Sequence, residues 1–236
     1  MSVVIIGGNE CMARQYKELC QEYQCSVKVF TQMKDGLKNK IGNPDLLVLF
    51  TNTMCEPLLI QHGAPTLAGM KTGSLFSCRF LSKEGMQEEI RRFNRMLAPK
   101  GVRILPLRYS GKKVLLYLYR PNLLRRDFSN QSTCLLLKKY GYCAENPGRC
   151  VAQLACRLRT MKDFPHEIGL FLGYPPEDVQ GFIENGADCC KFVGYWKVYG
   201  DEVKAKMIFS QYKKCTAIYH AQWKKGKSVE RLTVAV

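Results

Sequence analysis

The stretch GVRILPLRYSGKKVLLYLYR, residues 101–120, predicts the fold because it reads as two strands joined by a tight turn. Apolar and β-branched side chains dominate residues 102–109 and 112–120, and the SGKK segment between them supplies the glycine that hairpin turns favour. Two strands joined in this way pair antiparallel. The stretch therefore predicts a small antiparallel sheet in the middle of the chain.

The residues on either side of this hairpin follow mainly helical periodicity. Apolar side chains recur every three or four positions, and glycine, proline or polar residues stand at the segment ends. Residues 191–199 are strand-like and are expected to extend the sheet. We expect residues 54–236 to form an α+β domain in which several helices cover a small antiparallel sheet. The predicted helical segments are 56–78 (two short helices), 83–101, 130–143, 148–164, 164–186 (two short helices) and 201–227.

The first fifty residues are organised differently. SVVIIGGN (2–9), CSVKVF (25–30) and DLLVLF (45–50) are strands of the fully buried type, and residues 10–23 between the first two have helical spacing. Strands that alternate with helices form parallel sheets. Three strands and one clear helix make a small unit. We therefore expect residues 1–53 to form a parallel α/β fragment that packs on the remainder or is marginally stable alone.

The composition is that of a folded protein. Of the 236 residues, 46% are hydrophobic and 24% are charged, which argues against disorder. No apolar run approaches the roughly 18 residues that a membrane-spanning helix needs, so no membrane insertion is expected. The opening MSVVIIGGNE lacks the basic and small-residue features of a secretory signal, so the sequence predicts a cytoplasmic location and reduced cysteines.

The positive charge is unevenly distributed. The formal net charge is +16, and residues 54–236 carry thirty Lys and Arg against fifteen Asp and Glu. Such a surplus suits a phosphate-bearing ligand or RNA, or simply keeps the surface soluble. Within this part, the candidates for an anion pocket are Lys71, Arg108 and Arg120, and the candidates for stacking on bases are Tyr117, Tyr119, Tyr195 and Trp196.

FPHEIGLFLGYPPEDVQGFIENG, residues 164–186, has the pattern of two helices joined by a tight turn. That shape suggests a DNA reader, but the second helix offers Glu177, Asp178 and Glu184 and no Lys or Arg. Carboxylates in a DNA groove are repelled by the phosphates. Sequence-specific DNA binding is therefore not expected from this stretch.

His166 and Glu167 open this stretch and leave two interpretations. A His–carboxylate couple can bind a metal or transfer a proton, since histidine titrates near neutrality. Alternatively, the two residues form the start of a helix, with Glu167 answering the helix dipole. Both residues are catalytic candidates, and His166 is also a candidate metal ligand.

The cysteines offer a third kind of site. There are twelve, and none forms a CxxC pair, so common zinc-ribbon spacing is absent. Cys143, Cys150, Cys190 and Cys215, with His166, are candidate ligands for an iron–sulfur cluster or zinc. Alternatively, they are buried thiols that fill the core. Cys215 follows two lysines that would activate its thiol if they pointed toward it, which makes it a third catalytic candidate.

Two family resemblances divide the chain in the same place. MSVVIIGGNE and KVFTQMKDGLKNKIGNPDLLVLFTNT resemble the first half of a bacterial family, number twenty-three twenty-five in the series of domains of unknown function, and look like a truncated copy of it. The remainder of the chain, from about residue 55, resembles family number thirty-seven ninety-three of the same series over nearly its full length. The blocks that carry this second resemblance are APTLAGMKTGSLFSC, GVRILPLR, YLYRP, FPHEIGLFLGYPPEDVQGFIENG, GYWKVYGD and YKKC.

Neither family has an established activity, so the resemblance implies a fold and no reaction. The residues leave two functions open. One is a cytoplasmic metal- or redox-linked accessory protein that uses iron or zinc on cysteine and histidine side chains. The other is a binding module for a phosphate-bearing ligand or RNA.

Overall fold

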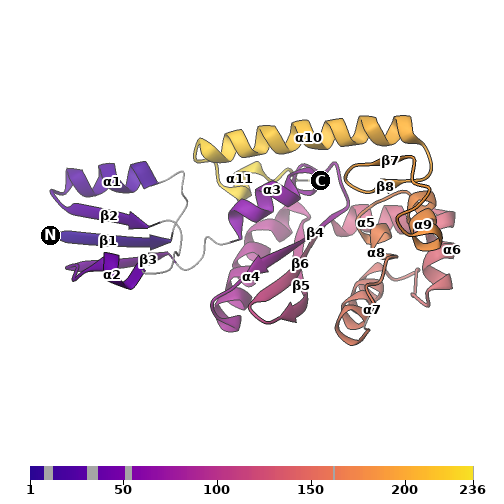
Figure 1. Cartoon of the computed structure of the whole chain (residues 1–236), viewed down its shortest axis with the longest axis horizontal. Helices are drawn as coiled ribbons and strands as arrows, with labels where there is room; N and C mark the ends of the chain where they lie inside the picture. The colour runs from indigo at the N-terminus through magenta and orange to yellow at the C-terminus, as the bar shows by residue number, and fades with distance from the viewer. Residues whose placement is uncertain (8–12, 31–36, 51–54, 162, 236) are drawn as a thin grey trace.

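The computed structural model describes residues 1–7, 13–30, 37–50, 55–161 and 163–235 (Figure 1). Two sheets of three strands and a short hairpin carry the β structure, and helices surround the second sheet. The predicted class, α+β with a parallel α/β fragment at the N-terminus, is confirmed.

The N-terminal sheet has the order β2-β1-β3, with all strands parallel. Val3 to Ile6 are buried, as expected for the middle strand of a parallel sheet. The second connection contains a short helix that the sequence did not predict. The elements are β1 (Ser2–Gly7), α1 (Ala13–Glu22), β2 (Ser26–Phe30), α2 (Leu37–Ile41) and β3 (Leu46–Phe50).

The central sheet has the order β4-β6-β5 and is antiparallel. The predicted hairpin is confirmed as β5 (Arg103–Ser110) and β6 (Lys113–Tyr119), and Gly111 turns the chain with a φ of +54°. The prediction of a second short helix before residue 78 is wrong, because Gly73–Arg79 forms β4. From Phe76 to Arg79 its side chains alternate between core and surface. The strand pairs with the edge of β6 opposite to the one that β5 occupies.

The two faces of β6 support two hydrophobic cores. Leu116 and Leu118 face a core under α3, α4 and α11, while Leu115 and Tyr117 face a second core under α5 to α9. This alternation follows from the two-residue period of a strand, so one strand fixes the position of both helical layers. The helices are α3 (Glu56–Leu67), α4 (Lys83–Leu97), η2 (Ala98–Lys100), α5 (Pro121–Phe128), α6 (Gln131–Lys139), α7 (Pro147–Thr160), α8 (Ile168–Phe171), α9 (Pro176–Asn185) and α11 (Val229–Leu232).

The long helix α10 (Glu202–Lys224) runs along the part of the molecule that follows residue 55, over α3 at one end and over a two-stranded hairpin at the other (Figure 1). This hairpin, β7 (Phe192–Val193) and β8 (Lys197–Val198), does not extend the central sheet as expected. Its side chains instead join α10 in a third apolar cluster around Trp196 and Phe209. None of the described helices is both long enough and apolar enough to cross a membrane.

Candidate functional site

Arg120 lies at the end of β6 and is buried, with only 1% of its surface exposed. Its guanidinium donates hydrogen bonds to the carbonyls of Thr66 and Leu67 (both 2.6 Å), Val234 (2.8 Å) and Lys100 (3.1 Å). Two of these carbonyls belong to the last residues of α3, where the helix dipole is negative. The geometry thus directs most of the Arg120 donors to protein carbonyls.

The other two anion candidates have surroundings different from those of Arg120. Lys71 is buried, and its Nζ lies 5.2 Å from the centre of the Tyr174 ring. Burial lowers the pKa of Lys71 to about 8, because an ammonium group loses its hydration there. Arg108 lies in β5, opposite Leu115 of β6. The described contacts therefore do not unite the three cations around one ligand.

The candidate metal ligands are committed to separate local contacts. The Cys150 thiol donates to the carbonyl of Cys143 (3.0 Å), and the Cys190 thiol points to the carbonyl of Ala187 (3.6 Å). Cys215 is buried in α10, and burial raises the pKa of its thiol, the opposite of activation. In the part of the chain that the structure describes, no three His, Cys, Asp or Glu side chains are placed to hold a metal ion.

Glu167 and His166 point to different partners. The Glu167 carboxylate is buried and accepts hydrogen bonds from the Tyr142 hydroxyl (3.0 Å) and from Arg157 Nη1 (2.8 Å). This network ties α7 to the segment before α8. His166 is exposed, and its ring meets the Phe182 ring edge-on at 4.9 Å between centres. The two residues thus do not act as a couple in this structure.

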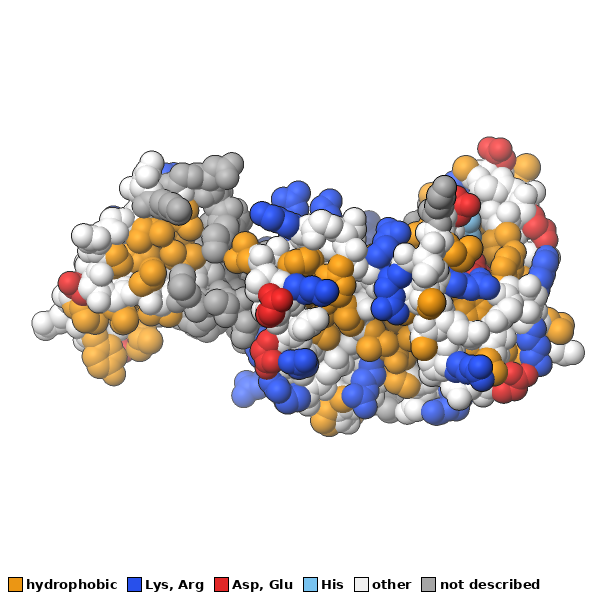
Figure 2. All heavy atoms as spheres, turned by 90° about the horizontal axis from the view of Figure 1, so that it is seen from below, with side chains coloured by type: hydrophobic (Ala, Val, Ile, Leu, Met, Phe, Trp, Pro, Cys, Tyr) orange, Lys and Arg blue, Asp and Glu red, His pale blue; other side chains and the backbone are white. Residues whose placement is uncertain are grey.

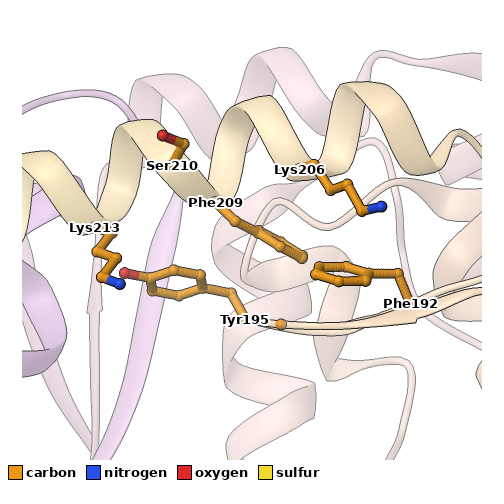
Figure 3. A pocket seen from close by; sticks show the side chains of 7 residues that line it. Phe192, Tyr195, Lys206, Phe209, Ser210 and Lys213 are labelled. Carbon is orange, nitrogen blue, oxygen red and sulfur yellow. The ribbon is translucent and has the colours of Figure 1, made fainter.

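An open groove of about 590 Å³ lies between the β7–β8 hairpin and α10 (Figure 3). Positions 209, 210 and 213 of α10 follow position 206 by three, four and seven residues, so all three lie on the same side of the helix as Lys206. The hairpin supplies the opposite wall. We call this feature the aromatic groove; its lining residues are Phe192, Gly194, Tyr195, Lys206, Phe209, Ser210 and Lys213.

Contacts between rings hold the groove in shape. The Phe209 ring centre lies 6.0 Å from that of Phe192 and 5.6 Å from that of Tyr195. A Cβ at Gly194 would lie 2.2 Å from a carbon of the Phe209 ring, so only glycine lets the hairpin approach α10 this closely. Tyr195 itself is 42% exposed, which leaves part of its ring available to a ligand.

Lysines stand at both ends of the groove. Lys206 Nζ forms an ion pair with Glu202 (2.6 Å) and lies 4.9 Å from the centre of the Phe192 ring. Lys213 is exposed and has no carboxylate partner among the described residues. Figure 3 shows its side chain lying toward the Tyr195 hydroxyl. The groove therefore combines exposed ring surface with one uncompensated positive charge.

A smaller pocket of about 310 Å³ lies between the β7–β8 hairpin and α9. We call it the ring pocket; Phe164, Tyr174, Phe182 and Trp196 line it, and His166 and Lys197 contribute polar groups. The buried Trp196 ring lies between the pocket and the groove, because it stacks on Tyr174 (4.7 Å) and meets Phe209 edge-on (4.4 Å).

Asp178 fixes Trp196 and the end of the hairpin. Its carboxylate is buried and accepts hydrogen bonds from Trp196 Nε1, from the backbone N–H of Tyr199 and from that of Gly200, each at 2.7 Å. These three bonds explain why an acidic residue stands in the helix that sequence reasoning considered for DNA. The carboxylate serves to position the hairpin.

Comparison with known families gives the chain its place. A family described as "Protein of unknown function (DUF3793)" matches residues 59–233. The chain belongs to this family. Residues 2–55 match a second family, described as "Uncharacterized protein conserved in bacteria (DUF2325)". Both resemblances inferred from the sequence are thereby confirmed, in the same order. No curated protein and no solved structure matches the chain.

The aromatic groove and the ring pocket both fall within the DUF3793 match. Sequence reasoning had named Tyr195, Trp196 and His166 but missed Phe209 and Lys213. The available signal was the spacing of Lys206, Phe209 and Lys213 on one face of α10, which places a ring between two basic side chains.

Proposed function

We propose that this DUF3793 protein binds single-stranded RNA through the aromatic groove. The observation that carries the proposal is the exposed Tyr195 ring and the half-buried Phe192 ring, which are supported from below by the buried Phe209. Lys206 and Lys213 stand on either side of these rings. Proteins that bind single strands combine rings that stack on bases with basic side chains that follow the phosphates. The groove offers both groups on one surface.

The charge distribution supports the same ligand. Figure 2 views the molecule from the side opposite α10, and it shows Lys and Arg side chains spread over the DUF3793 part but few on the N-terminal part at the left. The positive charge of the DUF3793 part is therefore not confined to the groove. On α10 itself the exposed lysines extend the basic surface beyond the groove. They are Lys204, Lys206, Lys213, Lys214 and Lys224.

The ring pocket adds room for one base beside the strand. It is lined by aromatic side chains, and Trp196 separates it from the groove. Lys197 Nζ lies 5.5 Å from the centre of the Phe182 ring, where it can meet a phosphate attached to an inserted base. A strand lying in the groove would thus place its neighbouring nucleotide near this pocket.

Fluorescence anisotropy with a labelled oligouridine of about 12 nucleotides tests the proposal. Binding should weaken as salt rises, because lysine contacts release counterions from the phosphates. Tyr195→Ala should raise Kd by about 5- to 150-fold, the equivalent of one lost stacking contact of roughly 1–3 kcal/mol. Lys213→Ala should lower the slope of log Kd against log salt by about 0.7.

Lys17→Ala, on exposed α1 of the N-terminal sheet, is the matched control because it removes one charge far along the chain from the groove. It should leave Kd within about twofold. The proposal fails if Lys17→Ala and Lys213→Ala weaken binding equally, since binding would then follow net charge alone. It also fails if a duplex of the same length binds as tightly, because duplex bases are not free to stack on Tyr195.

A further inference from the structure

Two buried thiols meet far from the groove. Cys55 immediately precedes α3, and Cys78 lies in β4. Their Sγ atoms are 3.0 Å apart, and the residues are 2% and 1% exposed. Met86 Sδ lies 3.9 Å from Cys55 Sγ. The two sulfurs are thus in direct contact within the core.

The fold brings these residues together through the packing of α3 on β4. Cys78 faces the same core as Phe76, two residues earlier in the strand. The Cys55 carbonyl accepts the first hydrogen bond of α3, from the N–H of Leu59 (2.9 Å). Core packing on both sides therefore maintains the contact between the sulfurs.

The surroundings make the two sulfurs unequal. A hydrogen bond from the Cys55 thiol lowers the pKa of Cys78, because it stabilises the Cys78 thiolate. The same hydrogen bond, with burial and the nearby Glu89 carboxyl, raises the pKa of Cys55. Cys78 is therefore the sulfur better prepared to react first, with a thiol already in contact with it.

We propose that Cys55 and Cys78 form a reversible oxidation site that closes to an intramolecular disulfide when the protein meets a peroxide. Hydrogen peroxide first converts the Cys78 thiol to a sulfenic acid and releases one water. The Cys55 sulfur then attacks the Cys78 sulfur, and the S–S bond forms. The sulfenic hydroxyl leaves with the Cys55 proton as a second water. Together the two thiols have given up two electrons, and these electrons have reduced one hydrogen peroxide to two waters.

The two sulfurs already lie close to bonding distance. The sulfurs must approach from 3.0 Å to a disulfide bond length of about 2.05 Å. The bond would tie the start of α3 to β4, at the point where the chain passes from the N-terminal sheet to the DUF3793 part. The inference is independent of RNA binding, since neither cysteine lines the groove.

Peptide mapping of the full-length protein tests the site. The folded protein is treated with hydrogen peroxide, denatured, alkylated and digested, and mass spectrometry then reads which cysteines are joined. We expect a Cys55–Cys78 linked peptide lighter by two hydrogen atoms, and its loss after dithiothreitol. Cys156→Ala, at an exposed cysteine, should leave the linkage unchanged, whereas Cys78→Ala should abolish it.

The wild-type map alone decides the matter if Cys78→Ala fails to fold. The proposal is overturned if Cys55 and Cys78 remain alkylated thiols while exposed Cys156 and Cys189 are oxidised. It is also overturned if Cys55 links only to cysteines other than Cys78, because the linkage would then reflect unfolding.

Discussion

Lys71 should make the stability of the protein rise with pH. Its ammonium group is buried against the Tyr174 ring, and burial lowers its pKa from 10.5 to about 8. Between these two values the unfolded chain holds the lysine proton and the folded chain releases it. The unfolded state then binds more protons, so the free energy of unfolding increases as pH rises through this window.

The size of the effect follows from the two pKa values. The Lys71 pKa is about 8 in the folded state and 10.5 in the unfolded state. With these values, the free energy of unfolding should increase by about 2 kcal/mol between about pH 7 and about pH 9.5. Lys71→Met keeps a long side chain of similar volume and has no proton to lose. The variant should lack this gain.

Urea unfolding followed by circular dichroism at both pH values measures the difference. Buried thiols oppose the gain above about pH 9, because their raised pKa values keep them protonated in the folded state. The comparison of wild type with Lys71→Met cancels that contribution. Equal changes in the two proteins between the two pH values would refute the assignment of a charged, poorly hydrated lysine to this position.

Two more substitutions test the polar groups that hold the fold. Arg120→Met leaves four carbonyls without their donor, those of Thr66 and Leu67 being buried, and should lower the free energy of unfolding by about 3–5 kcal/mol. Exposed Arg125→Met should change it by less than about 0.5 kcal/mol, with both values read from urea unfolding, and equal losses would contradict the role of Arg120. Asp178→Asn replaces one accepting oxygen by an NH2 group that faces N–H donors, so it should lower the free energy of unfolding by about 1–3 kcal/mol and shift the Trp196 emission to longer wavelength. Exposed Asp163→Asn should do neither, and an unchanged spectrum of Asp178→Asn would count against the hydrogen bond to Trp196.

Much of the fold could be predicted because its signals are local. The hairpin at residues 102–120 and the parallel strands near the N-terminus carry their periods within a few residues. Residues 73–79 were misread because a seven-residue segment with glycine, serine and cysteine has weak periodicity. Pairing with β6 makes this segment a strand, and the pairing partner of Phe76 is Leu116, forty residues later in the chain.

The roles of the polar residues depended on distant partners. Arg120 looked like a free cation, yet one acceptor is Val234, 114 residues later. Glu167 looked like half of a catalytic couple, yet Arg157 and Tyr142 hold it from an earlier helix and loop. A sequence shows residue types and spacing, but it does not show which donor meets which acceptor after folding. The aromatic groove was missed for a different reason: the hairpin directly precedes α10 in the chain, but residue spacing does not show that the hairpin folds back onto one face of that helix.

The Arg120 contacts also set an order for events during synthesis. The guanidinium emerges from the ribosome long before Val234, its most distant acceptor in sequence. Until Val234 is made, the Arg120 Nη2 group lacks one of its carbonyl acceptors and must bond to water instead. The junction of α3 with β6 then stays hydrated. A nascent chain paused before residue 234 should therefore keep an incompletely closed centre and remain a substrate for chaperones and proteases. Closure of this core thus waits for a residue that is made 114 residues after Arg120.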